Sequence, residues 1–242
     1  MTTLFLSDLH LDPVRPHITA LFERFLRGEA RAAQALYILG DLFESWIGDD
    51  DDSEIAQRVQ AALRDLVQAG VAVAFLHGNR DFLVGAAFAA RTGVHLLPDP
   101  APIMLAGEAT LLLHGDTLCL GDTVYQQVRR QLRDPAWQAQ FLAQPLAARR
   151  AFAARARAES QAHTAAAASD IMDVTPAEVL RVMAAQGATR LIHGHTHRPA
   201  RHPLTLPDGR PGERIVLGDW YEQGSVLRVD GARIELATLA AS

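Results

Sequence analysis

The sequence contains no lysine, because all 23 of its basic residues are arginine. This absence excludes a Walker-type phosphate-binding loop and a catalytic lysine that forms a Schiff base, since both need a lysine amine. A single cysteine, Cys119, excludes a disulfide framework within the chain and favours a reducing compartment. Cys119 follows an apolar run, so we expect its thiol to be buried and unreactive.

Long apolar stretches are also missing. The longest segments without a charged residue, 66–79 and 135–148, are shorter than the ~20 apolar residues of a membrane-spanning helix. The N-terminus enters an apolar strand pattern without the basic start and apolar core of a signal peptide. We therefore expect a soluble, intracellular chain that is at most held at a membrane surface. The net charge of -5 gives no polycationic signal for a nucleic-acid partner, and no obligate protein partner is evident.

The first half of the chain alternates short apolar strands with helical periodicity, which favours βαβ units and a largely parallel, buried sheet. Strands are predicted at 3–7, 35–39, 71–76 and 109–113, and helices at 17–31, 53–69 and 81–91. Ser53 is expected to cap the second helix. Further strands, which we expect to form a second sheet packed on the first, are predicted at 190–193, 214–217, 225–229 and 233–238. The length and the 49% hydrophobic content suit a single α/β domain over residues 1–242.

Residues 122–168 form a separate region within this domain. They are rich in Ala, Gln and Arg and have a helical pattern throughout, and residues 129–158 contain seven arginines against one acidic residue, Asp134. Two interpretations stay open: a solvated helical insertion with ordinary surface arginines, or a lid over an anionic substrate.

Five segments at or near the predicted strand ends carry side chains that bind metal ions. In chain order they supply Asp8, His10, Asp41, Asn79, His114, His195 and His197. The carboxyl ends of parallel strands meet at one edge of a sheet, so we expect these side chains to converge. The two-residue period of a strand would also place Asp8 beside His10, and His195 beside His197. Each motif alone is common in proteins, but the five together favour a functional site.

The residue types narrow the chemistry of this site. Carboxylates, imidazoles and one amide, without a thiolate, suit manganese, iron or zinc better than calcium or magnesium. Seven ligands are too many for one tetrahedral ion but suit two ions that share a bridging aspartate. Glycines beside four of the motifs would allow close approach to an ion or a phosphate. A pair of ions that activates water and clamps phosphate oxygens predicts hydrolysis of a phosphoester or phosphoanhydride.

The five motifs resemble, in the same order, the pattern D-x-H, G-D, G-N-[HR]-[DE], H and G-H-x-H of the calcineurin-like metallophosphoesterase superfamily. The resemblance implies two packed mixed β-sheets flanked by helices. It implies that one ion is held by Asp8, His10, Asp41 and His197, and the other by Asp41, Asn79, His114 and His195, with Asp41 bridging. The catalytic residues it implies are Asn79, Arg80, His114 and His195. Many members have histidine where this chain has Arg80, which stays protonated and would stabilise phosphoryl charge instead of donating a proton.

Longer stretches around these motifs, at 36–50, 77–82, 114–119, 171–174 and 192–199, are similar to the family of UDP-2,3-diacylglucosamine hydrolases of lipid A biosynthesis. This resemblance implies a manganese-dependent pyrophosphatase, with Mg²⁺, Fe or Zn²⁺ not excluded. It would cleave UDP-2,3-diacylglucosamine to UMP and 2,3-diacylglucosamine 1-phosphate (lipid X). The place of action implied is the cytoplasmic face of the inner membrane, where the chain would be a peripheral protein. The implied substrate contacts are Asn79, Arg80, Asp122, Ser160, Thr164 and His195.

One departure from this family concerns charge. Ala167 stands where a lysine is common, and we expect a nearby arginine such as Arg157 to replace that cation. Three apolar residues in the insertion either line a groove for acyl chains or merely dock its helices, and the sequence leaves both open: Leu142, Leu146 and Phe152.

Other conspicuous residues are expected to be structural. We expect the acidic run 49–52 to be a solvated loop, and the side chains of His77, His193, Trp46 and Trp220 to pack. Two alternative functions remain, namely a dinuclear phosphoesterase with another substrate and a scaffold that has lost catalysis. Arg80 and the insertion argue against the first, and the complete set of seven ligand residues argues against the second.

Overall fold

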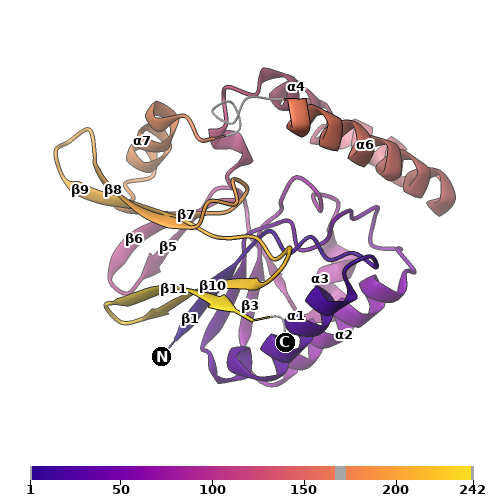
Figure 1. Cartoon of the computed structure of the whole chain (residues 1–242), viewed down its shortest axis with the longest axis horizontal. Coiled ribbons are helices and arrows are strands. Elements are labelled where there is room, and N and C mark those ends of the chain that lie inside the picture. The colour runs from indigo at the N-terminus through magenta and orange to yellow at the C-terminus, as the bar shows by residue number, and fades with distance from the viewer. Residues whose placement is uncertain (1, 167–172, 241–242) are drawn as a thin grey trace.

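Two β-sheets pack face to face, with helices on their outer sides (Figure 1). The computed structural model describes residues 2–166 and 173–240. The first sheet has the order β11-β10-β1-β2-β3-β4, with bounds β1 Thr3–Leu6, β2 Ala35–Ile38, β3 Ala72–Phe75, β4 His95–Leu96, β10 Gly224–Asp230 and β11 Arg233–Leu239. The second has the order β5-β6-β7-β9-β8, with bounds β5 Ala101–Leu105, β6 Glu108–Leu112, β7 Arg190–His193, β8 Ala200–Thr205 and β9 Pro211–Val216. Both sheets mix parallel and antiparallel pairs, so the predicted fold class is confirmed.

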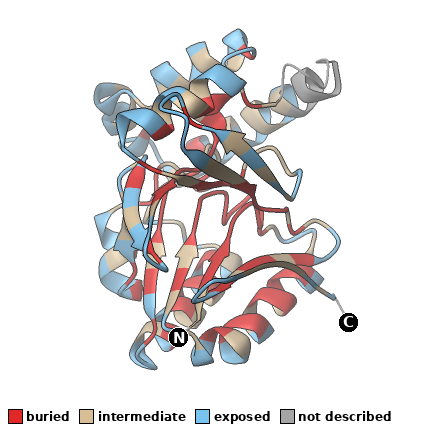
Figure 2. Ribbon diagram, turned by 90° about the vertical axis from the view of Figure 1, so that its left-hand side faces the viewer, coloured by how far each residue is buried: buried red, intermediate tan, exposed pale blue. Residues whose placement is uncertain are grey.

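Helices α1 (Pro16–Arg27), α2 (Glu54–Gln68) and α3 (Ala86–Thr92) cover the outer face of the first sheet. Their apolar faces form one core with the strands, and Ser53 caps α2 as predicted by accepting a hydrogen bond from the amide of Ala56. Helix α7 (Pro176–Ala185) packs on the second sheet through Val179 and Met183. Figure 2 shows the buried residues concentrated along the strands and on the helix faces that meet them.

The membership of the two sheets differs from the sequence prediction. Strands β10 and β11 were expected in the second sheet but extend the first, where β10 pairs antiparallel with β1. Strand β6, expected in the first sheet, instead pairs with β7 in the second. The burial of β10 explains its place, since Leu227 and Val229 face the core between the sheets and Val226 faces the core under α1. A strand buried on both faces belongs inside a covered sheet.

Several element boundaries also differ. The helix predicted at 17–31 ends at Arg27 and is followed by a separate 3₁₀ turn, Glu29–Ala32. The helix predicted at 81–91 starts only at Ala86, because the Asp81 side chain is buried and binds backbone amides. Strands β4, β5 and β8 were not predicted.

The insertion is made of three helices, α4 (Thr123–Leu132), α5 (Pro135–Leu142) and α6 (Leu146–Ala166), rather than one continuous helical run. Asp134 separates the first two, because its carboxylate caps the amides of Ala136 and Trp137 at the start of α5. Figure 1 shows α4 and α6 lying across the end of the two-sheet body, away from α1 and α2.

Arginines fasten these helices to the body. Arg149 of α6 is 2% exposed, pairs with Asp50 and donates a hydrogen bond to the carbonyl of Ile47. Arg150 pairs with Asp51 and Asp52. The acidic run is a loop with exposed Asp50 and Asp52, as predicted, and three of its carboxylates also anchor α6, which the sequence did not indicate. No helix within the described ranges has the length and apolar character needed to cross a bilayer.

Candidate active site

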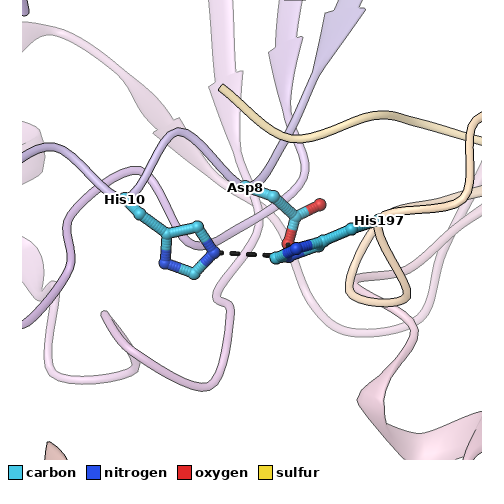
Figure 3. Close-up of side chains that lie close together, drawn as sticks. All are labelled: Asp8, His10 and His197. Atoms are coloured by element: carbon cyan, nitrogen blue, oxygen red, sulfur yellow. Dashed lines mark hydrogen bonds and ion pairs between the residues drawn. The ribbon is translucent and has the colours of Figure 1, made fainter. Parts of the chain in front are cut away.

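The structure brings all seven predicted ligand residues together between the ends of β1, β2, β3, β6 and β7. His197 Nε2 lies 3.3 Å from Asp8 Oδ1 and 3.4 Å from His10 Nε2. Figure 3 shows the rings of His10 and His197 turned toward each other beside the Asp8 carboxylate. Asp41 Oδ2 lies 3.8 Å from His10 Nε2, which joins Asp41 to this group.

A second group lies on the other side of Asp41. The same Oδ2 atom is 3.7 Å from His114 Nε2, and that nitrogen is 2.9 Å from Asn79 Oδ1. His195 Nδ1 lies 3.1 Å from the same Asn79 oxygen. Asp41 therefore stands between two groups of candidate ligands, and the assignment of four residues to each ion stays a prediction of the family resemblance.

The directions of these side chains are set by the local backbone conformation and not by strand periodicity. Strand β1 ends at Leu6 and β7 at His193, so the expectation that the two-residue period of a strand aligns the pairs is wrong. Six non-glycine residues with positive φ occur in the described ranges, and five of them are predicted ligands: Asp8, His10, Asp41, His195 and His197, with φ from 48° to 67°. Such left-handed conformations are strained for most L-residues and concentrate at functional sites.

Glycines allow the carboxylates to approach the backbone. A Cβ atom on Gly78 would lie 2.1 Å from Asp41 Oδ1, and one on Gly194 would lie 2.2 Å from Asp8 Oδ2. The glycines were expected to admit an ion or a phosphate. In the structure Gly78 and Gly194 admit these two carboxylates, whereas Gly40 admits the backbone of Gly78 and Gly115 admits the His193 ring. The approach of an ion or a phosphate stays a prediction.

Hydrogen bonds from backbone amides to buried carboxylates connect the loops of the site. The Asp8 carboxylate accepts hydrogen bonds from the amide of His195 and from Ser7 Oγ, which ties the first motif to the last. The buried Asp81 carboxylate accepts from the amides of Asp41, Leu42 and Gly78, which ties the ends of β2 and β3 together.

The electrostatics of the site follow from buried carboxylates beside imidazoles. Burial disfavours the imidazolium form of His114, but the carboxylates of Asp41, Asp8 and Asp116 outweigh burial and raise its pKa to about 9. Burial would raise the pKa of Asp8, yet the neighbouring His197 and other histidines hold it well below its usual range. Burial, together with the positive charge of His114, lowers the pKa of His195 to about 4.

These residues fit a pair of divalent cations. Their donors are carboxylate oxygens, imidazole nitrogens and one amide oxygen, and two of the carboxylates, Asp8 and Asp41, are 0% and 2% exposed. Ligand atoms that share an ion bound at ~2.1 Å are separated by about 3.0–3.4 Å. The neighbouring ligand atoms here are 2.9–3.8 Å apart, which spans that range. Two positive charges would also compensate the buried carboxylates.

Further acceptors lie behind three of the imidazoles. Glu44 Oε2 is 3.4 Å from His10 Nδ1, Asp219 Oδ2 is 3.6 Å from His197 Nδ1, and the carbonyl of Leu39 is 2.9 Å from His114 Nδ1. Acceptors in this position fix the tautomer that leaves Nε2 for the metal. Sequence reasoning missed Glu44 and Asp219, although Glu44 lies only three residues after Asp41.

A cavity of about 210 Å³ adjoins the ligand cluster beneath the insertion. Five of the six residues predicted to contact substrate line it: Asn79, Arg80, Asp122, Ser160 and His195. The sixth, Thr164, has a side chain outside the described part of the structure, as does Ala167. Arg80 Nη2 donates a 3.0 Å hydrogen bond to Ser160 Oγ of α6, while its buried Nε–H has no hydrogen-bond partner among the described residues.

Part of the cavity wall is apolar. Its aromatic part consists of Trp137, Phe141 and Phe152, whose ring centroids lie 5.0–5.9 Å apart, and Phe82 joins it from the body. Of the three apolar residues singled out from sequence, only Phe152 lines the cavity, whereas Leu142 is 40% exposed. Phe141 and Trp137 were missed because the weakly patterned α5 gave no signal of which face is apolar.

Tyr125 of α4 was also missed. Its ring lies 6.0 Å from that of His195, and its hydroxyl donates a 2.5 Å hydrogen bond to buried Asp116. Arg129 donates to the same carboxylate at 2.7 Å. Asp116 follows His114 in its motif, so the signal was present but was not interpreted.

Four residues expected to pack do so, although one of them, Trp46, also lines the cavity. His193 is buried, with Nδ1 2.8 Å from the Gly194 carbonyl and Nε2 3.2 Å from Arg214 Nη1, so neither nitrogen faces the ligand cluster. His77 bonds the Val84 carbonyl, and Trp46 and Trp220 are 2% and 0% exposed in the core. Cys119 is also buried, and burial raises the pKa of its thiol to about 12.

Comparison with known proteins agrees with this geometry. The family model for calcineurin-like phosphoesterases matches residues 1–199, and the chain belongs to that family. Proteins named UDP-2,3-diacylglucosamine hydrolase from Xanthomonas oryzae pv. oryzae (strain PXO99A), Xanthomonas campestris pv. campestris (strain B100) and Stenotrophomonas maltophilia (strain K279a) are each 58% identical to it over 247 residues. The alignments cover 99% of this chain and 99–100% of the relatives. The family resemblance seen in the sequence is thereby confirmed.

Proposed function

We propose that this chain hydrolyses the pyrophosphate of UDP-2,3-diacylglucosamine to UMP and 2,3-diacylglucosamine 1-phosphate, as an enzyme of lipid A biosynthesis. The observation that carries the proposal is the cavity that joins the seven-residue cluster to an apolar wall. One end offers cationic and polar groups suited to a diphosphate, and the other offers aromatic surface suited to acyl chains. The names and full-length similarity of the relatives support the same substrate.

Two manganese ions are the proposed cofactors, with Mg²⁺, Fe and Zn²⁺ as alternatives that the same donors accept. One would be held by Asp8, His10, Asp41 and His197, and the other by Asp41, Asn79, His114 and His195. When bound, the ions would supply Lewis acidity, which makes water a nucleophile near neutral pH and offsets charge on phosphate oxygens.

The protein's own side chains bind and orient the diphosphate. Arg80 lines the cavity, and its buried Nε–H has no hydrogen-bond partner in the described part of the chain. Its guanidinium stays charged at neutral pH, so it suits an oxygen on which negative charge develops. The Asn79 amide oxygen lies 2.9 Å from His114 Nε2 and 3.1 Å from His195 Nδ1, so these three atoms can share the second cation. Ser160 and Asp122 add polar contacts at the rim of the insertion, and Arg157 supplies a cation in place of the family lysine at Ala167.

The apolar wall binds the acyl chains and excludes water. Each CH₂ group that leaves water contributes ~0.8 kcal/mol, so even part of two acyl chains accounts for much of the substrate affinity. Because the wall is built from α5 and α6, the insertion acts as the lid of the site. Removing water beside the diphosphate also strengthens its electrostatic contacts.

We further propose that the chain works as a peripheral protein on the cytoplasmic face of the inner membrane, where such a lipid is held. Val124 and Val128 are 57% and 45% exposed and lie one turn apart on α4. The exposed Arg130 lies on the same helix, and its charge would attract anionic head groups. Flotation with anionic vesicles tests this, since replacing both valines with serine should reduce binding.

The assay of the main proposal uses purified chain, Mn²⁺ and UDP-2,3-diacylglucosamine, and measures UMP. We expect turnover that is abolished by a chelator and by Asn79→Ala. Hydrolysis of bis(p-nitrophenyl) phosphate without release of UMP would instead favour a phosphoesterase with another substrate. Absence of turnover with either compound would favour a non-catalytic scaffold.

A further inference from the structure

Glu44 lies between the ligand cluster and the lid. Its side chain is buried, with Oε2 3.4 Å from His10 Nδ1 and 3.4 Å from Arg15 Nη2. Its other oxygen, Oε1, forms an ion pair with Arg157 of α6. A single carboxylate therefore contacts a proposed metal ligand, the segment before α1 and the lid helix.

Each contact constrains Glu44 physically. An acceptor at Nδ1 keeps the His10 proton on that nitrogen, so that Nε2, which faces Asp41 and His197, is left to bind a cation. A cation on Nε2 polarises the ring and strengthens the attraction between Nδ1–H and the carboxylate. Because Glu44 is only 8% exposed, a carboxylate that lost Arg157 would be left with less compensation for its desolvation.

We propose that Glu44 is a positioning residue that couples cation binding at His10 to docking of the lid helix α6 through Arg157. A cation at His10 would hold the Glu44 carboxylate more firmly in place, and the carboxylate would in turn stabilise Arg157 and the docked position of α6 over the cavity. Coupling of this kind is reciprocal, so a docked lid also favours the bound cation. The inference rests on the proposed function, because it needs a metal at His10.

Asp219 provides a matched comparison. It lies behind His197 as Glu44 lies behind His10, with Oδ2 3.6 Å from Nδ1. Its contacts among the described residues are with His197 and the amide of Tyr221, and neither belongs to the insertion. Asp219 can therefore orient a ligand without reaching the lid.

The first measurement is Mn²⁺ affinity by titration calorimetry. We expect both Glu44→Gln and Asp219→Asn to weaken binding by at least ~10-fold, the usual effect of removing an acceptor behind a ligating histidine. An affinity for Glu44→Gln equal to that of the unmodified chain would overturn the positioning role. Circular dichroism verifies that each variant is folded.

The second measurement is hydrogen exchange of the α6 amides, with and without Mn²⁺ at a concentration that saturates each variant. In the unmodified chain Mn²⁺ should slow exchange in α6 several-fold. This slowing should disappear in Glu44→Gln and in Arg157→Gln, and persist in Asp219→Asn. It should also persist in Arg150→Gln, which removes an arginine from the same helix that pairs with Asp51 and Asp52 instead.

The outcomes separate this inference from the proposed function. Slowing that persists in Glu44→Gln, or is lost equally in Asp219→Asn, contradicts coupling through Glu44. An unmodified chain that binds Mn²⁺ without any change in α6 exchange contradicts the coupling and leaves the hydrolase function intact. An unmodified chain that binds no Mn²⁺ contradicts both.

Discussion

Asp41 accepts a 2.8 Å hydrogen bond from the backbone amide of Arg80 through Oδ1, while its other oxygen, Oδ2, faces two imidazoles. Oδ2 lies 3.8 Å from His10 Nε2 and 3.7 Å from His114 Nε2. One side chain thus fixes the loop that carries Arg80 and also stands between the two halves of the site.

Because the two oxygens of Asp41 have different contacts, Asp41→Asn should affect cation binding but not the fold of the Arg80 loop. The amide oxygen can still accept from Arg80, but an NH₂ group replaces the anionic oxygen between the histidines. We expect a folded protein with UMP release reduced at least ~100-fold and less bound manganese, measured by elemental analysis. Full manganese content in this variant would show that Asp41 is not a shared ligand.

Arg80→Ala should lower turnover without lowering the manganese content. The variant should fold and bind manganese normally, because the Arg80 side chain does not contact the ligand cluster. We expect kcat for UDP-2,3-diacylglucosamine to fall by roughly 10²-fold, since a preorganised cation facing developing charge is worth that much. Arg80→Lys should recover only part of the loss, because lysine lacks the planar fork. Unchanged turnover in Arg80→Ala would remove Arg80 from the phosphate site.

The aromatic wall predicts a substrate-dependent loss. Phe152→Ala removes a ring from the cavity and should raise KM for the diacylated substrate about 10-fold, while hydrolysis of bis(p-nitrophenyl) phosphate stays unchanged. Leu142→Ala is the control, because Leu142 lies on the lid but outside the cavity. Equal losses with both substrates would indicate that Phe152 supports the fold of the lid and not acyl binding.

The free energy of unfolding should depend on pH through the ionisation of Asp99. Its side chain is 11% exposed, and burial together with the nearby Asp116 raises its pKa to about 6. The folded state therefore holds this proton more tightly than the unfolded state, so the contribution favours folding at low pH and is lost as pH rises through 6.

Urea unfolding of the unmodified chain and Asp99→Asn measures this effect. We expect the difference in free energy of unfolding between them (unmodified minus variant) to fall by about 1 kcal/mol from pH 5 to pH 7.5. A difference that is independent of pH would show that Asp99 titrates at its ordinary value.

The comparison of sequence with structure is instructive at particular residues. The position of Asp41, Asn79 and His114 at strand ends could be predicted, because apolar runs of strand length stop just before them. Strand periodicity could not predict the side-chain directions of four ligands: Asp8, His10, His195 and His197. Their directions depend on left-handed backbone conformations. Long-range hydrogen bonds, such as the one from the His195 amide to Asp8, support these conformations.

Sheet membership was harder to predict for a related reason. Strand β10 has an apolar pattern that suits either sheet, and only the pairing of its register with β1 decides between them. The roles of Asp50, Asp116 and Glu44 depend on arginine or tyrosine partners 9 to 113 positions away, and nothing in the local sequence identifies those partners.

The central claim is that two cations share Asp41. Anomalous diffraction from a crystal soaked in Mn²⁺ tests it directly. We predict two peaks, one contacted by Asp8, His10, Asp41 and His197 and the other by Asp41, Asn79, His114 and His195. A single peak that does not touch Asp41, or no peak at this cluster, would contradict the account.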